Sequence, residues 1–129
     1  MSDLQRILYV EDEPDIQAVA KMALEMVGGF VVKICSSGEE ALKDGQGFMP
    51  DLILLDVMMP NMDGPSTLLA LRQQTALSET PVIFMTAKVQ PIEVEYYKSI
   101  GAKGVIAKPF DPMTLATQVR TIWETSHDA

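Results

Sequence analysis

Short apolar runs and longer amphipathic runs alternate five times along this sequence. The apolar runs are rich in Val, Ile, Leu and Phe and show little polar alternation, which is typical of strands that are covered on both faces of a sheet. They cover residues 6–10, 30–35, 51–55, 82–85 and 105–107. The pattern therefore predicts five buried strands.

Helical periodicity follows each apolar run. In the first helical segment Pro14 suits a first-turn position after Asp12 or Glu13, and Gly28 with Gly29 ends the helix. An apolar stripe along this segment contains Ile16, Val19, Ala20, Ala23 and Val27. The other predicted helices cover residues 37–43, 64–74, 91–100 and 112–125. Their apolar positions are Leu68, Leu69 and Leu71, then Val94, Tyr97 and Ile100, then Leu115, Val119, Ile122 and part of Trp123. Ser36 or Ser37, together with Glu39 or Glu40, is placed to cap the second helix.

Five strand–helix units in succession predict an α/β fold of the (βα)5 type. Because crossovers between parallel strands are right-handed, the helices should cover both faces of a doubly wound parallel sheet. No linker, repeat or low-complexity tract interrupts the pattern. We therefore expect one domain over residues 1–129.

Polar residues follow four of the five apolar runs. Glu11 and Asp12 come after the first run, Asp56 after the third, Thr86 after the fourth and Lys108 after the fifth. The carboxyl ends of parallel strands meet at one edge of a sheet, and ligands of such folds bind there. The sequence thus predicts a site that contains three carboxylates, a hydroxyl and an amine.

Three ionised carboxylates in one pocket repel one another unless some of them are protonated or a cation lies between them. A few oxygen ligands favour magnesium, which keeps several waters and accepts only a few protein carboxylates. Lys108 supplies a counter-charge that can contact a carboxylate or an incoming anion. Taken alone, Asp12 could equally be a helix cap, because it stands just before a helix.

Asp56 is the strongest candidate for an acceptor of a phosphoryl group. An aspartate can form an acyl phosphate, and that transfer depends on cations that clamp the phosphoryl group more than on a general base. Asp56 ends the most apolar strand and begins an irregular loop over residues 57–64, which leaves room above it. Asp63, in that loop, is better explained as a turn or capping residue than as a ligand.

Four segments together resemble the receiver domains of bacterial two-component response regulators. They read LYVEDEP at residues 8–14, LLDVMMP at 54–60 with Asp63 and Gly64, MTA at 85–87 and KPF at 108–110. The resemblance spans nearly the whole chain. It implies a flavodoxin-like fold with strand order 2-1-3-4-5.

The resemblance also implies the partners and the metal. Asp56 would accept the phosphoryl group from a phosphohistidine on a sensor kinase or a phosphotransfer protein. Asp12, Asp56 and the backbone carbonyl of Met58 would bind Mg²⁺, with Glu11 acting directly or through water, and Mn²⁺ could take its place. The chain would be a signalling phosphoacceptor that assists its own phosphorylation and dephosphorylation rather than an enzyme.

The switch residues implied by the resemblance are Thr86, Ala87 and Lys108. Thr86 and Lys108 would bind phosphoryl oxygens, and the small Ala87 would leave the site open to water or a phosphatase. Movement of Thr86 would signal to the fourth helix and the fifth strand. A downstream protein would then read the surface formed by the fourth helix, the fifth strand and the fifth helix.

The sequence departs from the usual family pattern at two positions. Glu11 stands where aspartate is frequent, and its extra methylene can shift the geometry of the metal. Val105 stands three residues before Lys108, where many receivers carry an aromatic residue that couples to the threonine. Tyr96 and Tyr97 are the candidates to replace that aromatic residue. The peptide before Pro109 is often cis in the family, whereas sequence alone favours trans, since only about 5–6% of X–Pro bonds are cis.

Composition narrows the classes of partner and the location. The 129 residues are 47% hydrophobic, enough for a continuous core. Their net charge of −8 argues against direct binding to nucleic acid. Cys35 is the only cysteine and is expected to be buried and unreactive. The N-terminus lacks a basic segment followed by an apolar stretch, and no apolar run approaches the ~20 residues that cross a bilayer. We therefore expect a cytoplasmic protein without a membrane partner.

Other functions fit the sequence less well than that of a receiver domain. A phosphatase of the haloacid dehalogenase type needs an acid two residues after its nucleophile, where this chain has Met58. Dinucleotide binding needs a Gly-x-Gly-x-x-Gly motif after the first strand, and none is present. A degenerate receiver that docks partners without phosphorylation is the remaining alternative. The chain could also be one domain of a longer regulator, although no basic helix-turn-helix pattern follows Trp123.

Overall fold

The computed structural model describes residues 3–127. Five parallel strands form one sheet in the order β2-β1-β3-β4-β5, which confirms the strand order that the resemblance implies. The strands are β1 (Arg6–Val10), β2 (Val31–Cys35), β3 (Leu52–Asp56), β4 (Val82–Thr86) and β5 (Gly104–Ala107). The helices are α1 (Pro14–Met22), α2 (Gly38–Phe48), α3 (Gly64–Leu71), α4 (Pro91–Ser99) and α5 (Leu115–His127). A π-helical turn η1 (Ala23–Val27) continues α1, and a 3₁₀ turn η2 (Thr75–Leu77) precedes β4.

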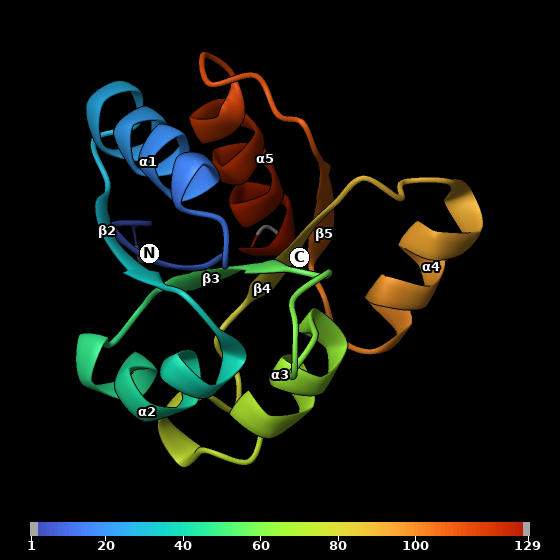
Figure 1. Cartoon of the computed structure of the whole chain (residues 1–129). Helices are drawn as coiled ribbons and strands as arrows, with labels where there is room; N and C mark the ends of the chain where they lie inside the picture. The colour runs from blue at the N-terminus through green and yellow to red at the C-terminus, as the bar shows by residue number, and fades with distance from the viewer. Residues whose placement is uncertain (1–2, 128–129) are drawn as a thin grey trace.

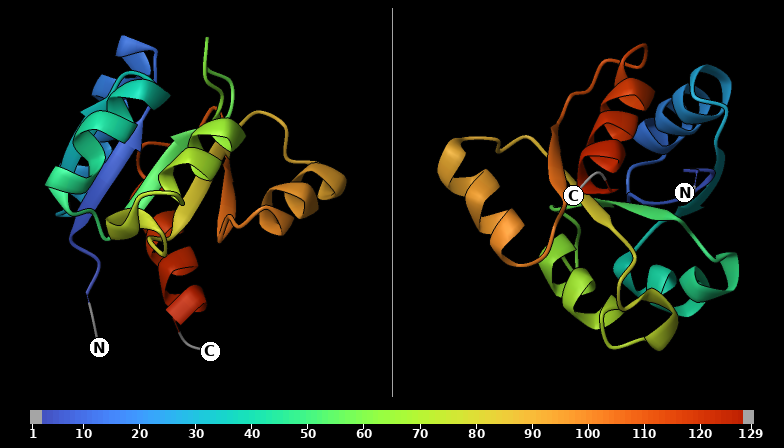
Figure 2. Two further views of the ribbon diagram at one scale, coloured as in Figure 1. Left: turned by 90° about the horizontal axis from the view of Figure 1, so that it is seen from below. Right: turned by 180° about the vertical axis from the view of Figure 1, so that it is seen from behind.

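The helices cover both faces of the sheet. Figure 1 shows α1 and α5 on one face, α2 and α3 on the other, and α4 beside β5 at the edge; the turned views of Figure 2 agree. Successive side chains of a strand point to opposite faces, so each strand feeds two cores. The core under α1 and α5 includes Ile7, Tyr9, Leu52, Leu54, Ile83 and Met85. The core under α2 and α3 includes Leu8, Val10, Ile53, Leu55, Val82 and Phe84.

The register of the central strands determines which residues meet at the carboxyl edge. Tyr9 pairs with Leu54 and Val10 pairs with Leu55. The next residues along the two strands are Glu11 and Asp56, which therefore emerge side by side. Because side chains alternate along a strand, both acids lie on the face of the sheet that α1 and α5 cover.

The first helix differs from the sequence prediction. Ala20 and Ala23 are buried as predicted, but Val19 and Val27 are 44% and 49% exposed. From Ala23 to Val27 the chain is π-helical, and the extra residue in that turn breaks the 3.6-residue period from which the stripe was read. The stripe prediction was wrong for both valines, and the π-helical turn explains the exposure of Val27 only, because Val19 precedes the turn.

The other elements differ from prediction mainly at their ends. Strand boundaries agree within one residue, whereas α2 extends to Phe48, α3 stops at Leu71 and α5 begins at Leu115. The oxygen of Ser37 accepts a hydrogen bond from the N–H of Glu40, so Ser37 is the predicted N-cap of α2. None of the helices within residues 3–127 is both long and apolar enough to cross a membrane.

The start of α3 lies directly against the end of β3, and a glycine makes that approach possible. A β-carbon on Gly64 would lie 2.7 Å from the carbonyl oxygen of Asp56 and 2.8 Å from the α-carbon of Val57. These are backbone atoms, so they cannot rotate aside. We predict that Gly64→Ala lowers the free energy of unfolding by about 1–3 kcal/mol in urea denaturation.

Gly47 provides the matched control for this substitution. It lies in α2, and a β-carbon there would meet nothing within 4 Å. Gly47→Ala should therefore raise the free energy of unfolding by up to about 1 kcal/mol, as expected for alanine in a helix. Equal effects of the two substitutions would contradict the close approach at Gly64.

Candidate functional site

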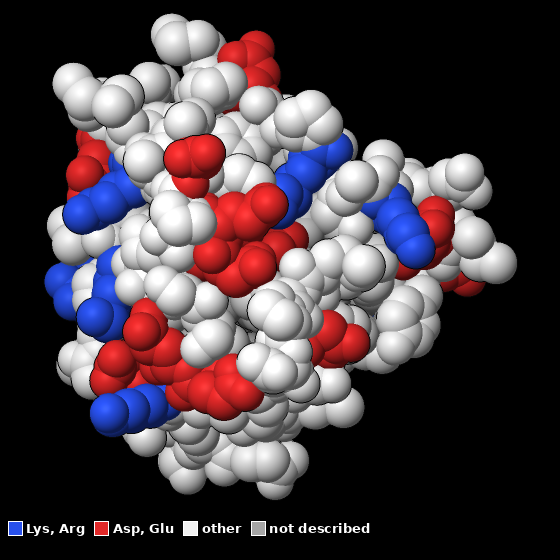
Figure 3. Space-filling view, viewed as in Figure 1, with Lys and Arg blue, Asp and Glu red and all other residues white. Residues whose placement is uncertain are grey.

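The residues predicted from the strand ends come together at one edge of the sheet. Asp12, Asp56, Thr86 and Lys108 line one cavity of about 260 Å³. Its other lining residues are Glu13, Met58 and Ala87. Figure 3 shows acidic side chains gathered near the middle of the view, with basic side chains placed around them. Glu11 does not line the cavity and is fully buried.

Lys108 joins two carboxylates that lie on neighbouring strands. Its Nζ donates to Oε1 of Glu11 at 2.9 Å and to Oδ1 of Asp56 at 3.0 Å. Burial lowers the pKa of Lys108, but the hydrogen bonds to Glu11 and Asp56 outweigh it and leave that pKa above its ordinary value. The ammonium is therefore charged at all physiological pH values.

Asp56 is 2% exposed, so the negative charge of its carboxylate is unfavourable there. Burial, followed by the negative charge of Glu11, raises its pKa from 3.8 to about 6, although the hydrogen bond from Lys108 opposes this. At neutral pH the carboxylate is ionised but poorly solvated. A bound cation would relieve that cost, because it would replace the missing solvation.

Glu11 is held by donors on both oxygens. Besides Lys108, its Oε1 accepts from the hydroxyl of Tyr9 at 3.4 Å, and its Oε2 accepts from the backbone N–H of Glu13 at 3.1 Å. Burial and the nearby charges of Glu11 and Asp56 raise the pKa of Tyr9 far above its usual range, so this phenol stays protonated. Sequence reasoning missed Tyr9. Its place two residues before Glu11, on the same face of a strand, was the available signal.

Thr86 ends β4 and is 2% exposed. Its Oγ1 accepts a hydrogen bond at 3.0 Å from the backbone N–H of Lys88, in the loop that leads to α4. Ala87 is exposed beside it, and Met58, which also lines the cavity, is 67% exposed. The predicted role of the Met58 carbonyl stays a prediction.

The donor set fits a hard divalent cation. Glu11, Asp12 and Asp56 each offer a carboxylate oxygen, and these atoms all lie within 4.8 Å of one another. Oxygen ligands of this kind suit Mg²⁺. Three carboxylates against the single ammonium of Lys108 leave a local excess of two negative charges, which a divalent ion would balance.

Predictions for Asp63, for Cys35 and for the peptide before Pro109 have different outcomes in the structure. Asp63 caps α3, since its Oδ1 accepts from the N–H of Ser66 at 2.9 Å. Cys35 is buried, and burial raises the pKa of its thiol to about 11, so it is the unreactive thiol that was expected. The Lys108–Pro109 peptide is cis, whereas sequence alone favoured trans.

The aromatic residues near the predicted relay lie in the core under α2 and α3. Val105 is half-buried and packs against that core. The ring of Tyr97 lies 5.2 Å from that of Phe84 and 5.6 Å from that of Tyr96, with tilted planes in both pairs. Tyr97 is therefore part of the core and Tyr96 covers it from outside, half exposed.

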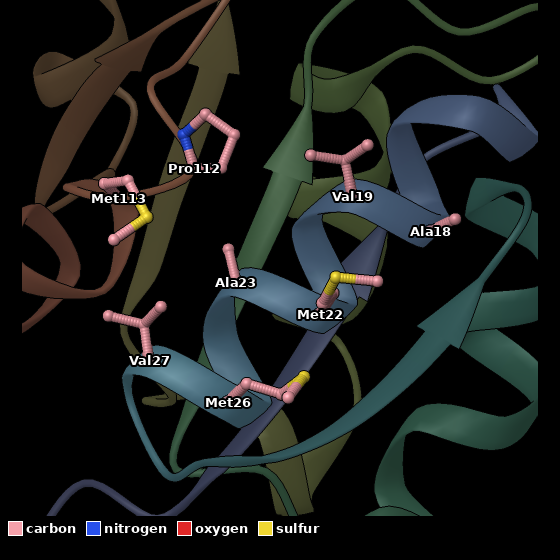
Figure 4. Close-up of a pocket in the computed structure, with 8 residues that line it drawn as sticks. All are labelled: Ala18, Val19, Met22, Ala23, Met26, Val27, Pro112 and Met113. Carbon is pink, nitrogen blue, oxygen red and sulfur yellow. The ribbon is translucent and has the colours of Figure 1, made fainter.

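A second, apolar groove lies on the α1 side of the molecule. Figure 4 shows side chains from α1, η1 and the segment before α5 facing this groove, which has a volume of about 470 Å³. They are Ala18, Val19, Met22, Ala23, Met26, Val27, Pro112 and Met113. None of the residues that line the acidic cavity lines this groove.

Comparison with known proteins gives a consistent set of similarities. The sequence model described as "Response regulator receiver domain" matches residues 7–120. The chain is 39% identical over 124 residues to the transcriptional regulatory protein CpxR of Escherichia coli, covering 96% of this chain and 51% of that protein. It is 37% identical over 125 residues to the alkaline phosphatase synthesis transcriptional regulatory protein PhoP of Bacillus subtilis, with 97% and 51% covered. The chain thus spans about half the length of the curated relatives it matches.

A solved structure of similar length shares the fold. The chemotaxis response regulator CheY4 of Vibrio cholerae superimposes with a TM-score of 0.85 at 31% sequence identity. The match covers 93% of this chain and 99% of that one.

The raised pKa of Asp56 has a testable effect on the free energy of unfolding. The folded chain holds the Asp56 proton more tightly than the unfolded chain, so this group favours folding below its unfolded pKa near 3.8 and loses that contribution as pH rises through about 6. We predict that Asp56→Asn raises the free energy of unfolding at pH 7.5 by about 1–2 kcal/mol in chelator, less than the roughly 3 kcal/mol of the whole shift because the contact with Lys108 is weakened.

The gain should shrink as pH falls from 7.5 to 5, and urea denaturation at several pH values measures it. Glu79→Gln is the control, because Glu79 is exposed and the same charge is removed there without relief of burial. A destabilised Asp56→Asn variant at pH 7.5 would show that Asp56 is not under unfavourable charge.

Proposed function

Because this chain belongs to the family of response regulator receiver domains, we propose that it is a switch whose Asp56 accepts a phosphoryl group. The observation that carries the proposal is the Asp56 carboxylate at the end of β3. One of its oxygens contacts Lys108, and the residue opens on the cavity that Asp12 and Thr86 also line.

The donor in this proposal is a phosphohistidine of a sensor kinase or a phosphotransfer protein. A carboxylate oxygen of Asp56 attacks phosphorus, the P–N bond breaks, and the imidazole keeps the electron pair of that bond. Lys108 is positioned to hold the carboxylate before transfer and a phosphoryl oxygen after it. The hydroxyl of Thr86 reaches a second phosphoryl oxygen when it leaves the N–H of Lys88.

The acidic residues would hold the metal in this proposal. Asp12 and Asp56, two of the three clustered acids, would bind Mg²⁺. The backbone carbonyl of Met58 would be a further ligand, Glu11 would act directly or through water, and Mn²⁺ could take the place of Mg²⁺. The ion would neutralise carboxylate and phosphoryl oxygens during transfer.

The output of the switch is a protein contact in the cytoplasm. Thr86 is hydrogen-bonded to the loop that enters α4, so its movement alters that loop directly. The side chains of Ile92 and Tyr96 on α4 are 76% and 52% exposed and give the surface of α4, β5 and α5 apolar contact area. A net charge of −8 makes a protein partner a better fit than nucleic acid.

The apolar groove supplies a docking surface for the protein phosphodonor. Its two walls continue from the acidic cavity: α1 follows Asp12, and Pro112 with Met113 follows Lys108 by a few residues. A donor seated on this groove would contact the helix that follows Asp12 and the segment that follows Lys108. Three methionines, Met22, Met26 and Met113, give an adaptable apolar surface that suits a helical partner.

We predict that the unaltered chain is labelled by a small phosphodonor such as acetyl phosphate in the presence of Mg²⁺, and that Asp56→Asn is not. The reason is that an amide is too weak a nucleophile to form the acyl phosphate. Intact-mass spectrometry measures the added phosphoryl group. A chelator should abolish labelling of the unaltered chain.

Equal labelling of both proteins would show that Asp56 is not the acceptor. Labelling that is unchanged by the chelator would show that the reaction does not need the metal. If the unaltered chain is not labelled but still binds its target, the alternative of a docking module without phosphorylation applies. Glu79→Gln serves as the control, since this exposed acid lies outside the cavity.

The docking surface predicts different effects on two donors. Met26 is 79% exposed in the groove, so Met26→Glu should fold normally but place a charge against an apolar partner. We expect kcat/KM for transfer from a phosphorylated histidine kinase domain that labels the unaltered chain to fall by about tenfold or more. The rate with acetyl phosphate should stay within about twofold, because the cavity is unchanged.

Leu69→Glu is the matched control, since Leu69 is 62% exposed on α3, on the opposite face of the sheet. An equal loss with both donors, or an equal loss in the Leu69→Glu variant, would contradict docking at the groove.

A further inference from the structure

The two carboxylates that contact Lys108 are not equivalent. Glu11 is fully buried and lies outside the cavity, whereas Asp56 lines it. Both oxygens of Glu11 accept hydrogen bonds, from Lys108 and Tyr9 on Oε1 and from the Glu13 N–H on Oε2. Within residues 3–127, Asp56 accepts a side-chain hydrogen bond on Oδ1 only, so its Oδ2 is free.

The hydroxyl of Tyr9 has a single partner in this arrangement. Tyr9 is 0% exposed, and its ring lies in the core under α1 and α5 among residues such as Leu54 and Met85. Among the residues that the structure describes, its hydroxyl contacts Glu11 alone, at 3.4 Å. A fully buried hydroxyl needs a hydrogen-bond partner, so even a long hydrogen bond to Glu11 is favourable.

The hydroxyl can act in one direction only. The hydroxyl of Tyr9 donates to Oε1 of Glu11, an oxygen that also accepts from the ammonium of Lys108. The rigid ring is fixed by the core around it, and β1 places it on the same face as Glu11. Tyr9 therefore gives Glu11 a fixed donor that comes from the core rather than from the cavity.

We propose that Tyr9 is a positioning residue, whose hydroxyl holds Glu11 as the stationary counter-ion of Lys108 so that Asp56 keeps an oxygen free for the phosphoryl group. The proposal rests on the proposed phosphoacceptor function of Asp56. Tyr9 contacts neither the metal nor the phosphoryl group, and it acts through Glu11 and Lys108. Removal of the hydroxyl takes away one of the donors to Glu11, beside the Glu13 N–H and Lys108, and so loosens the contact between Glu11 and Lys108.

Tyr9→Phe tests this with the loss of one oxygen atom. The first measurement needs no phosphorylation: the side-chain ammonium signal of Lys108 is followed by ¹⁵N NMR in chelator, and its proton exchange with water is timed. We expect the ammonium protons of Lys108 to exchange at least about threefold faster in Tyr9→Phe, because the loss of one weak hydrogen bond corresponds to a factor of this size. The second measurement is the labelling rate with acetyl phosphate at saturating Mg²⁺, which should fall by about threefold or more.

Thr67→Val is the matched control. Thr67 is also 0% exposed, and its hydroxyl donates to the carbonyl oxygen of Asp63 at 2.8 Å, so this variant loses a buried hydroxyl bond outside the cavity. A purely structural loss of stability should be similar in the two variants. Thr67→Val should leave the Lys108 exchange and the labelling rate within about twofold of the unaltered chain.

The proposal requires both effects in Tyr9→Phe. It is overturned if either measurement stays within the range of Thr67→Val. Failure of the proposed function is recognised separately, because the unaltered chain would then not be labelled at Asp56. If the unaltered chain is labelled normally and Tyr9→Phe matches Thr67→Val, only the role of Tyr9 is lost.

Discussion

The ammonium of Lys108 between two buried carboxylates is the interaction on which the rest of the site depends. Parallel pairing of β1 and β3 forces Glu11 and Asp56 out of the sheet side by side, and both are almost without solvent. Two such charges could not easily remain ionised together without a cation, because both are buried and they repel each other. Lys108 follows β5, an edge strand of the sheet, so the site exists only when β1, β3, β4 and β5 have assembled.

The same alternation of side chains that fills the two cores also determines the chemistry of the site. Tyr9 and Glu11 are successive residues on one face of β1, and Leu54 and Asp56 are their neighbours on β3. The apolar members of these pairs exclude water from below, and that burial is the largest cause of the raised pKa of Asp56. The carboxylate is therefore made responsive to cations by the core that supports it, and the acceptor cannot be separated from the packing of the sheet.

Sequence reasoning predicted the features that local patterns determine. It failed for the features that depend on contacts between distant segments. The strand ends carrying Asp56, Thr86 and Lys108 follow from apolar runs and fold topology, and the cap at Asp63 follows from local spacing. The π-helical turn from Ala23 to Val27 packs beside α5, and neither the turn nor that contact can be recognised in a periodic pattern. Sequence reasoning assigned no role to the side chain of Tyr9, since its contact with Glu11 appears only when the face of the strand and the position of Lys108 are known together.

The contacts of Lys108 and Thr86 indicate that phosphorylation would replace their hydrogen-bond partners rather than add new ones. Lys108 already contacts Glu11 and Asp56, and Thr86 already accepts a hydrogen bond from the loop before α4. A phosphoryl group on Asp56 would take over contacts that exist in this state, so its favourable interactions are offset by those that it replaces. The net free-energy difference between the two states is then small compared with either set of contacts, and a partner that prefers one of them can shift the population. A stationary Glu11 matters in such a balance, because Lys108 keeps one partner while the other is changed.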